Sequence, residues 1–392
     1  MILTNEQEQA LKIILNKYKN HEKYVTICGY AGVGKSTLAK FAIEALDVSP
    51  EKVAYATYTG KAAEVLRKKG NPNAMTLHKL LYDSIPRQGG GFIRIPKKTL
   101  DYDIVLIDEI SMAPKSMLEM LLKHKVFCIF MGDNFQLPQI DKNEAHDFLQ
   151  HPDIFLSTVM RQAAESEIIQ LTMKIRNGED IPFMHGKEVI VAPKAELVTG
   201  HLTWADIIIC ATNKTRHNMN RQKRELLGYS GVLQTGERII VKRNYWEDCD
   251  EDGNALVNGT IGTVANPYES FVRIPSYVKN DRRDLPLIGC IFTPDGGKSF
   301  DTFEIDKDYL LKEEPCVDWR VSYQLGKLKP KIGDILPKQA TYGYALTCHA
   351  AQGSEFDKVL VIEESFPFDK VEHQRWLYTA ATRASDKLVL VR

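Results

Sequence analysis

The sequence predicts an α/β fold with two parallel sheets covered by helices, in which the second sheet domain carries a β-rich insertion. Three observations lead to this fold class. Short apolar stretches alternate with amphipathic ones between residues 5 and 131, which is the pattern of a parallel sheet with helical crossovers. From about residue 231 this pattern gives way to β-type segments, and apolar strands return after about residue 338. The β-rich part is therefore expected to interrupt a second α/β domain.

Composition allows such an architecture and narrows the class of protein. The chain has 392 residues, 44% of them hydrophobic and 26% charged, which is enough for the cores of two or three domains. Lys plus Arg and Asp plus Glu both number 51, so a nucleic acid would have to bind in a locally basic groove. Seven scattered cysteines without a C-x-x-C pair, no apolar stretch that could span a membrane and no secretory leader predict an intracellular, non-secreted protein.

The first domain begins with a helix predicted over 5–19. Its apolar residues share one face, and its start fits a capping box of Thr4 and Gln7. The strands that follow are apolar throughout, as expected when helices cover both faces of a sheet. They are predicted over 25–27, 53–56, 104–107 and 126–131, with helices over 35–46, 61–69 and 115–123 between them.

Two insertions interrupt the α/β pattern. Residues 85–97 contain a run of three glycines between Pro86 and Pro96, which favours a β-hairpin, with an ordinary loop as the alternative. The segments "GERIIVKRN" and "VNGTIGTV" open the β-rich part, which we interpret as a small barrel over 231–338. Strands of the second α/β domain are predicted on either side of it, over 207–211, 344–346, 359–362 and 388–391.

The stretch "GYAGVGKST" follows the first strand and satisfies the pattern G-x-x-x-x-G-K-[ST] in full. Its glycines let consecutive backbone N–H groups turn inward around phosphate oxygens, and the next helix adds the positive end of its dipole. We expect Lys35 to reach the β- and γ-phosphates and the Ser36 hydroxyl to bind Mg²⁺; a chance glycine-rich turn is the alternative. The predicted nucleotide-binding residues of this loop are Gly29, Ala31, Gly32, Val33, Gly34, Lys35, Ser36 and Thr37.

Two adjacent acids, Asp108 and Glu109, close the apolar strand 104–107. A carboxylate in this place is suited to hold Mg²⁺, which we assign to Asp108, and the next one to polarise water for attack on the γ-phosphate, which we assign to Glu109. An acid that caps the following helix is the alternative. The stretch "GDNFQLP" follows the next strand, and the neutral amide of Gln136 is placed to sense the γ-phosphate, although the same stretch also makes a good turn.

Together these stretches resemble superfamily 1 helicases, and more closely their RecD-like branch. The resemblance covers both α/β domains in the order of that family, whereas the β-rich part matches only loosely. Two departures are Ala350, where a basic residue is common, and the shortness of 85–97, which leaves no long wedge. The segments that carry the resemblance are "TYTGKAA" (57–63), "MTLHKLL" (75–81), "IDEISM" (107–112), "GDNFQLP" (132–138), "MRQAAESEI" (160–168), "TCHAAQGSEFD" (347–357) and "LYTAATRASD" (377–386).

The resemblance implies two RecA-like P-loop domains, with a hairpin insertion at 85–97 in the first and an SH3-like β-barrel insertion at 231–338 in the second. It implies ATP and Mg²⁺ as cofactors, single-stranded DNA and the fork duplex as partners, and activity as a monomer. It also implies a cytoplasmic location in a bacterium or a phage-infected cell, or another intracellular one. The RecA-like domains would comprise residues 1–84 with 98–184, and residues 185–230 with 339–392.

The resemblance also assigns roles to individual residues around the nucleotide. Gln7 would read the adenine, and Gly353 and Glu355 would face the nucleotide. Arg161 and Arg383 would be arginine fingers that reach the γ-phosphate from across the cleft between the domains and stabilise charge in the transition state. A surface ion pair is the alternative for each arginine. The predicted catalytic residues are thus Lys35, Asp108, Glu109, Gln136, Arg161 and Arg383.

Contacts to the single strand are expected from short polar or basic side chains in the matching segments. An aromatic side chain beside the hairpin turn, Phe92, is placed to stack on the last base pair, which would make the hairpin the pin that separates the strands. Solvated or helix-capping roles are the alternatives to strand contact for these side chains. The two histidines among them, His78 and His349, lack partners at the spacing of metal ligands. The predicted strand contacts are Thr59, Lys61, Thr76, His78, Phe92, Thr347 and His349.

The leading interpretation is an ATP-dependent DNA helicase that moves 5′→3′ on single-stranded DNA and unwinds duplex DNA. An RNA helicase, or a nucleic-acid-stimulated ATPase without strand separation, is the first alternative, because single-strand grooves contact mainly the backbone. A P-loop kinase or small-molecule transferase is disfavoured by the second α/β domain. A clamp that binds ATP only as a structural ligand is disfavoured by intact Lys35, Asp108 and Glu109.

Overall fold

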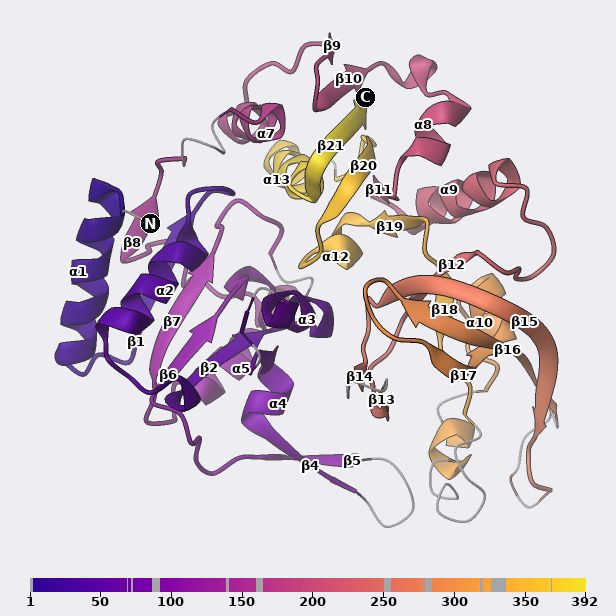
Figure 1. Ribbon diagram of the computed structural model, residues 1–392, viewed down its shortest axis with the longest axis horizontal. Helices are drawn as coiled ribbons and strands as arrows, with labels where there is room; N and C mark the ends of the chain where they lie inside the picture. The colour runs from indigo at the N-terminus through magenta and orange to yellow at the C-terminus, as the bar shows by residue number, and fades with distance from the viewer. Residues whose placement is uncertain are drawn as a thin grey trace. The chain divides into compact units, whose positions relative to one another are not determined.

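The structure is a computed structural model (Figure 1) that forms two compact units. The two-sheet unit comprises Met1–Tyr82, Pro96–Thr212 and Thr347–Arg392, and the inserted unit comprises Asp83–Ile95 and Asn213–Leu346. None of the helices in the described part of the chain is long and apolar enough to cross a membrane. The structure describes residues 3–68, 70–71, 73–86, 92–138, 141–159, 165–249, 255–276, 278, 284–317, 320–325, 336–367 and 369–392.

The first sheet of the two-sheet unit has six parallel strands in the order β3-β2-β6-β7-β1-β8. This confirms the parallel sheet that the alternating sequence pattern predicts, and the helices confirm the predicted crossovers. The strands are β1 (Tyr24–Gly29), β2 (Val53–Thr57), β3 (Met75–Thr76), β6 (Ile104–Ile107), β7 (Phe127–Gly132) and β8 (Ile154–Leu156). The helices are α1 (Asn5–Lys19), α2 (Lys35–Ala45), α3 (Gly60–Lys68), α4 (Leu77–Leu81) and α5 (Lys115–Leu121).

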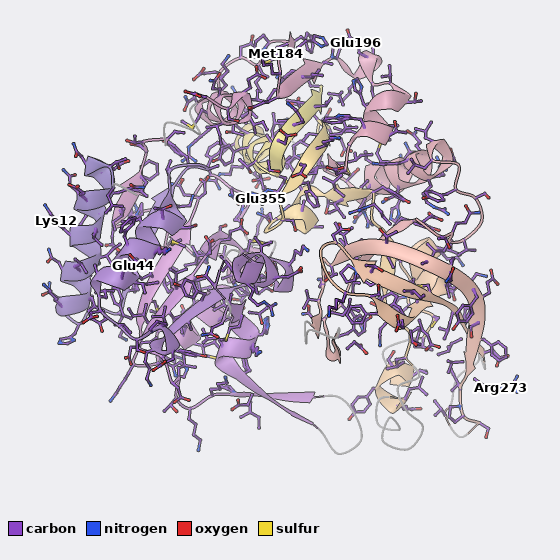
Figure 2. All side chains as sticks on the ribbon, viewed as in Figure 1. Lys12, Glu44, Met184, Glu196, Arg273 and Glu355 are labelled. Carbon is purple, nitrogen blue, oxygen red and sulfur yellow. The ribbon has the colours of Figure 1, made fainter. Side chains whose placement is uncertain are left out.

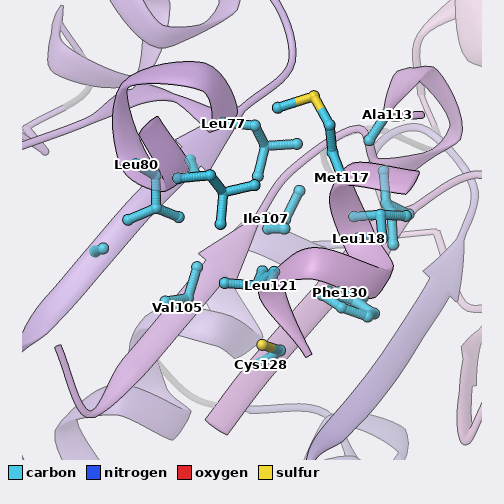
Figure 3. Close-up of a cluster of buried hydrophobic side chains, with 14 of the residues drawn as sticks. Leu77, Leu80, Val105, Ile107, Ala113, Met117, Leu118, Leu121, Cys128 and Phe130 are labelled. Atoms are coloured by element: carbon cyan, nitrogen blue, oxygen red, sulfur yellow. The ribbon is translucent and has the colours of Figure 1, made fainter. Parts of the chain in front are cut away.

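Strand β6 shows why the strands of this sheet are apolar throughout. Ile104 and Leu106 belong to the buried cluster on one face of the sheet, and Val105 and Ile107 to the cluster on the other. Figure 3 shows the second cluster, in which α4 and α5 pack leucines over β6 and β7. Because each such side chain contributes about 1.5–3 kcal/mol when fully buried, both faces hold the strand in register.

The second sheet of the chain has the order β19-β11-β20-β21-β10-β9. Strands β11, β20, β21 and β10 are parallel and β9 is antiparallel to β10. β20 and β21 start several residues before the predicted 359–362 and 388–391, which an apolar pattern misses because polar, exposed residues stand at their second and third positions. The elements are β9 (Met184–His185), β10 (Val189–Ala192), β11 (Ile207–Cys210), β19 (Ala345–Thr347), β20 (Phe356–Ile362), β21 (Ala384–Val391), α7 (Glu167–Asn177), α8 (Thr199–Trp204), α12 (Cys348–Ala351) and α13 (Lys370–Ala381).

The inserted unit is built around a five-stranded antiparallel sheet in the order β17-β16-β15-β12-β18. Its strands confirm the change to β structure that the sequence predicts near residue 231. In the same unit β4 and β5 pair as a two-stranded sheet, and so do β13 and β14. The elements are β4 (Tyr82–Pro86), β5 (Phe92–Pro96), α9 (Asn213–Leu226), β12 (Arg238–Val241), β13 (Tyr245–Cys249), β14 (Ala255–Leu256), β15 (Ile261–Arg273), β16 (Asp284–Pro294), β17 (Phe300–Asp306), α10 (Lys307–Lys312) and β18 (Ala340–Tyr342).

Candidate active site

A glycine-rich loop connects β1 to α2. Gly32 and Gly34 have φ angles of 76° and 81°, in the left-handed region that residues with a side chain disfavour. Gly29 admits no side chain either, because a Cβ there would lie 2.8 Å from the carbonyl oxygen of Leu156. Lys35 turns its ammonium group back over the loop and donates to two loop carbonyls, at 2.9 and 2.8 Å. The loop therefore has the backbone shape and the positive charge that a phosphate group requires.

A cavity of about 640 Å³ adjoins this loop at the carboxyl edge of the first sheet. Both sheets contribute to its lining, and Figure 2 labels one lining residue from each, Glu44 on α2 and Glu355 just before β20. The predicted site residues that the structure brings together in this lining are Ser36, Thr37, Asp108, Glu109, Gly353, Glu355 and Arg383.

Glu109 occupies the most constrained position in the cavity. Its backbone is left-handed, with φ 52° and ψ 47°, and its N–H donates to the Asp108 carboxylate at 2.9 Å. A non-glycine residue in that region stores about 1–3 kcal/mol of strain, which often marks a functional site. The side chain is 25% exposed, yet its Oε2 atom is enclosed and has no hydrogen-bond partner in the described part of the chain. Burial raises the pKa of the Glu109 carboxyl, and the Arg383 guanidinium opposes that rise.

Arg383 reaches the cavity from the second sheet. Its side chain is almost completely buried, and Nη1 lies 3.7 Å from Oε1 of Glu109. Two carbonyls hold the guanidinium in place, those of Thr379 and Ser354, each at 3.2 Å. The structure thus brings the predicted finger of the second domain beside the predicted base of the first, although the two residues are far apart in the sequence.

The donor set of the cavity fits a magnesium nucleotide. A serine hydroxyl and a carboxylate, from Ser36 and Asp108, are the hard oxygen ligands that Mg²⁺ prefers. Buried polar atoms normally have a partner, so the enclosed Oε2 of Glu109 indicates that a polar group belongs beside it. Together with the glycine loop, these groups would hold the phosphates and the metal at one edge of the sheet.

A buried polar network beside the loop was not predicted from the sequence. Asp133, which follows β7, pairs with Arg176 of α7 at 2.9 Å and accepts a hydrogen bond from the Tyr378 hydroxyl at 2.5 Å. The same hydroxyl accepts from the Ala31 N–H of the loop at 3.5 Å, and the Arg176 guanidinium lies 4.1 Å from the Tyr30 ring centroid. The network therefore ties helices α7 and α13 to the phosphate loop. No local pattern signals it, because its members meet only in the fold.

Not every predicted nucleotide residue is among the described residues that line the cavity: of the loop only Ser36 and Thr37 are, whereas Lys35 and the residues before it are not. Gln7 is buried, forms the predicted capping box with Thr4, and donates to the Val33 carbonyl at 3.3 Å, so it joins α1 to the loop. Gln136 is not among the described residues that line the cavity; its backbone N–H donates to the Asp133 carbonyl at 3.3 Å. Arg161 lies outside the described residues. The roles predicted for Gln7, Gln136 and Arg161 stay predictions.

Strand contacts predicted on the first sheet lie at the starts of α3 and α4. The Thr59 and Thr76 hydroxyls cap these helices, accepting N–H groups at 3.2 and 3.3 Å. Lys61 pairs with a glutamate of its own helix at 3.2 Å. The His78 ring lies between two tyrosine rings, with centroid distances of 5.9 and 6.2 Å. The capping role is therefore observed for both threonines, and strand contact stays a prediction for all four residues.

The remaining predicted strand contacts lie elsewhere in the chain. Thr347 is the N-cap residue of α12 and makes no side-chain capping bond, and His349 lies within that helix. Burial lowers the pKa of His349, so its ring is neutral near pH 7. Phe92 begins β5, and its side chain lies outside the described residues, as do the glycines of the hairpin turn.

Two family models match this chain. Residues 2–189 match the model described as "AAA domain", which contains the glycine-rich loop and the acidic pair. Residues 342–391 match the model described as "UvrD-like helicase C-terminal domain", which contains Gly353, Glu355 and Arg383. The two matches thus carry the residues that line the cavity from both sheets.

Two curated proteins show how far the similarity extends. The ATP-dependent DNA helicase dda of Enterobacteria phage T4 is 30% identical over 191 residues, covering 45% of this chain and 43% of that protein. The ATP-dependent RecD2 DNA helicase of Deinococcus radiodurans is 32% identical over 407 residues, covering 97% of this chain and 48% of that protein. The chain therefore spans less than half the length of these two relatives.

Solved structures of Pif1 helicases share the fold. One Bacteroides Pif1 structure, in complex with ADP-AlF3 and single-stranded DNA, has a TM-score of 0.54 at 19% identity and covers all of this chain and 92% of that one. A second, from work on forked duplex DNA with two coordinating Pif1 helicases, has a TM-score of 0.56 at 20% identity with the same coverage. These matches confirm the predicted resemblance: the chain is related to superfamily 1 helicases of the RecD and Pif1 type.

Proposed function

We propose that the chain is an ATP-dependent DNA helicase, which hydrolyses ATP, moves 5′→3′ on single-stranded DNA and separates duplex DNA. The single observation that carries the proposal is the position of Arg383, 3.7 Å from Glu109 in a cavity lined by both sheets. A site divided between two sheets can couple nucleotide hydrolysis to their relative movement, which a motor requires. The relatives named above as ATP-dependent DNA helicases support the same reaction.

The predicted site residues in and beside the cavity have distinct roles in this reaction. Lys35 and the loop amides bind the phosphates, and Mg²⁺ held by Ser36 and Asp108 would offset their negative charge. Glu109 accepts a proton from the attacking water. Arg383 exchanges its contact with that carboxylate for the γ-phosphate, where a guanidinium stabilises the charge of the transition state. Arg161 is proposed as a second finger, with Gln7 at the adenine and Gln136 as the γ-phosphate sensor.

The architecture proposed for this motor has two RecA-like domains, one of residues 1–84 with 98–184 and the other of 185–230 with 339–392. An SH3-like insertion over 231–338 would support the fork. Single-stranded DNA would cross both RecA-like domains and contact the residues predicted for the track, and the chain would act as a monomer inside the cell. The residues proposed for the track are Thr59, Lys61, Thr76, His78, Thr347 and His349.

Unwinding assays with tailed duplexes test the proposal. DNA and RNA duplexes with a 5′ or a 3′ single-stranded tail are incubated with the protein, ATP and Mg²⁺, and strand separation is followed by fluorescence. Separation of the 5′-tailed DNA duplex is expected. Preference for a 3′ tail would contradict the direction, and preference for RNA would favour an RNA helicase. Stimulated ATP hydrolysis without separation of any duplex would identify a nucleic-acid-dependent ATPase instead.

The hairpin of β4 and β5 is proposed as the separation pin. Replacing Phe92 with Ala removes the aromatic face that would stack on the last base pair. DNA-stimulated ATP hydrolysis and movement along single strands should then persist while duplex unwinding falls sharply. Loss of all three activities together would instead indicate a role of the hairpin in folding or strand binding, and an unchanged unwinding rate would place the pin elsewhere.

A further inference from the structure

Gly353 lies in the short turn between α12 and β20, where two sheets meet beside the cavity. Its φ angle of +74° is one that residues with a side chain rarely adopt. A Cβ at this position would lie 3.2 Å from Oε2 of Glu109, 3.2 Å from Oγ1 of Thr59 and 3.1 Å from the Cβ of Ala62. The glycine is therefore packed directly against the carboxylate predicted to activate water and against the start of α3.

We propose that Gly353 is a positioning residue that transmits occupancy of the single-strand track to the Glu109 carboxylate. This inference rests on the proposed function, since it takes the track to be bound by DNA. The turn at Gly353 follows the predicted strand-contact segment of the second sheet and lies beside both Glu109 and Thr59 of the first, and the missing side chain leaves the carboxylate room to move.

The contacts of Glu109 indicate that its position can change. Oε2 is enclosed but makes no hydrogen bond to any described residue, and Oε1 is 3.7 Å from Arg383, which is longer than a hydrogen bond. No short contact therefore fixes the carboxylate, and its location is set mainly by the atoms packed around it. Gly353 supplies the wall next to Oε2, so a small displacement of that wall moves the group that must orient water.

Predicted strand contacts of both sheets adjoin this wall, in space on the first sheet and along the chain on the second. Thr59 ends the loop after β2 and caps α3, so a strand bound at the start of α3 pushes on Thr59 and thereby on Gly353. On the other side, Thr347 is the N-cap residue of the short helix α12 and His349 lies within it, and Gly353 follows directly after the C-cap residue of that helix. A strand held by both segments closes them on the turn from two directions.

Ser354, the residue after Gly353, connects the same turn to Arg383. The carbonyl of Ser354 accepts a hydrogen bond from Nη1 of Arg383 at 3.2 Å, the same nitrogen that faces Glu109. Movement of one turn therefore repositions the base and the finger together. Because catalysis depends on near-attack geometry, a misplacement of about 1 Å is enough to cost about 10²-fold in rate.

A glycine-to-alanine comparison tests the proposal against a matched control. Gly228 has a φ of +79°, close to that of Gly353, but an added Cβ there meets nothing within 4 Å. Gly353→Ala and Gly228→Ala therefore impose similar backbone strain, and only the first inserts a methyl group beside Glu109. The measurements are ATP turnover with and without saturating single-stranded DNA, the KM for ATP, fluorescent-nucleotide binding, single-strand affinity and thermal unfolding.

We expect Gly353→Ala to lower DNA-stimulated kcat by about 10–100-fold. Basal turnover should fall too, because the same carboxylate serves it, but by a smaller factor, so the ratio of stimulated to basal turnover decreases. KM, nucleotide affinity and single-strand affinity should stay within about 2-fold of the wild-type protein, because the change affects positioning rather than binding. Gly228→Ala should match the wild-type protein in all kinetic measurements. Equal behaviour of the two variants would overturn the proposal.

A second variant separates the effect on Glu109 from crowding of α3. Adding Ala62→Gly to Gly353→Ala removes the 3.1 Å contact and leaves those with Glu109 and Thr59. The double variant should stay slow, and restored turnover would overturn the proposal by assigning the defect to the helix. Failure of the proposed function is distinguishable, since the wild-type protein would then show no DNA-stimulated turnover at all.

Discussion

The two sheets of the two-sheet unit contribute to one cavity from opposite ends of their strands. In the first sheet the functional residues follow the strands: Ser36 lies beyond β1, and Asp108 and Glu109 come directly after β6. In the second sheet they precede the strands, since Glu355 comes just before β20 and Arg383 just before β21. In the proposed function the first sheet thus supplies the groups that bind the phosphates, whereas the second adds groups to them.

This difference indicates that nucleotide binding and ATP turnover can be changed separately in the molecule. Parallel sheets bind ligands at the carboxyl ends of their strands, which is where the glycine loop and the acids lie. Arg383 and Gly353 approach that site from a separate sheet, so the proposed motor could move them without dismantling the glycine loop and the acidic pair. Changes on the first sheet should therefore remove nucleotide binding or chemistry outright, and changes on the second should spare binding.

Lys35→Ala should have the largest effect. The substitution removes the positive charge over the loop, so ATP turnover should be abolished, and nucleotide affinity should fall about 10–100-fold for the loss of a charge-assisted contact of about 1.5–3 kcal/mol. Fluorescent-nucleotide titration and steady-state hydrolysis measure both quantities. Lys115→Ala, at a half-exposed lysine of α5, is the control. Retained turnover in Lys35→Ala would remove the phosphate assignment.

Arg383→Ala should sharpen the comparison of the two sheets, because it should separate nucleotide binding from ATP turnover. Removal of an arginine finger costs about 10³-fold or more in turnover in related phosphoryl-transfer systems. Nucleotide affinity should change little, because the first sheet holds the phosphates alone. The control is Arg221→Ala, at an arginine of α9 whose side chain is 70% exposed. A variant that lost stability while turnover held would identify Arg383 as a structural ion-pair residue.

The sequence predicts the first sheet's share of the site well and the second's poorly. The glycine loop and the acidic pair are contiguous motifs whose chemistry is local, so they can be recognised without a fold. The meeting of Arg383 with Glu109 depends on packing between elements, and only the resemblance to helicases predicts it. The network of Asp133, Arg176 and Tyr378 has no sequence signal, because each residue is ordinary by itself.

The sequence alone is likewise insufficient to locate the ends of some strands and to recognise which side chains cap helices. Polar, exposed residues stand at the second and third positions of β20 and β21, so an apolar pattern cannot locate the starts of these strands. Thr59 and Thr76 fit both a strand contact and a helix cap, and the structure shows that both hydroxyls accept backbone N–H groups. Sequence reasoning therefore finds the positions but cannot choose between two uses of the same oxygen.

Tyr378→Phe should have a moderate effect, on stability more than on chemistry. The change removes the hydroxyl that donates to Asp133 and accepts from Ala31, and so weakens the tie between α13 and the loop. A hydrogen bond to a charged group contributes about 1.5–3 kcal/mol, and the free energy of unfolding should fall by about that amount. Chemical denaturation measures it, with Tyr18→Phe as the control. An unchanged midpoint and slope would show that the network does not hold the two elements together.

Replacing His349 should have the smallest effect, which is seen only in how the free energy of unfolding depends on pH. Burial lowers its pKa, so the native state takes up this proton less readily than the unfolded chain, whose histidine titrates near about 6.5. Its contribution to stability is therefore present above that pH and declines as the pH falls below it. Unfolding of His349→Gln and the wild-type protein at pH 7.5 and 5.5 tests the sign. The wild-type protein should lose more stability than the variant on acidification, and the opposite order would contradict a buried neutral ring.

The most direct test of the central claim is ATP turnover of the wild-type protein with and without single-stranded DNA, measured beside Glu109→Gln. The account predicts that DNA raises turnover several-fold or more in the wild-type protein, and that Glu109→Gln binds nucleotide and DNA normally but shows neither basal nor stimulated hydrolysis. Turnover that is indifferent to DNA, or near-normal hydrolysis by Glu109→Gln, would contradict a two-sheet motor that uses this carboxylate.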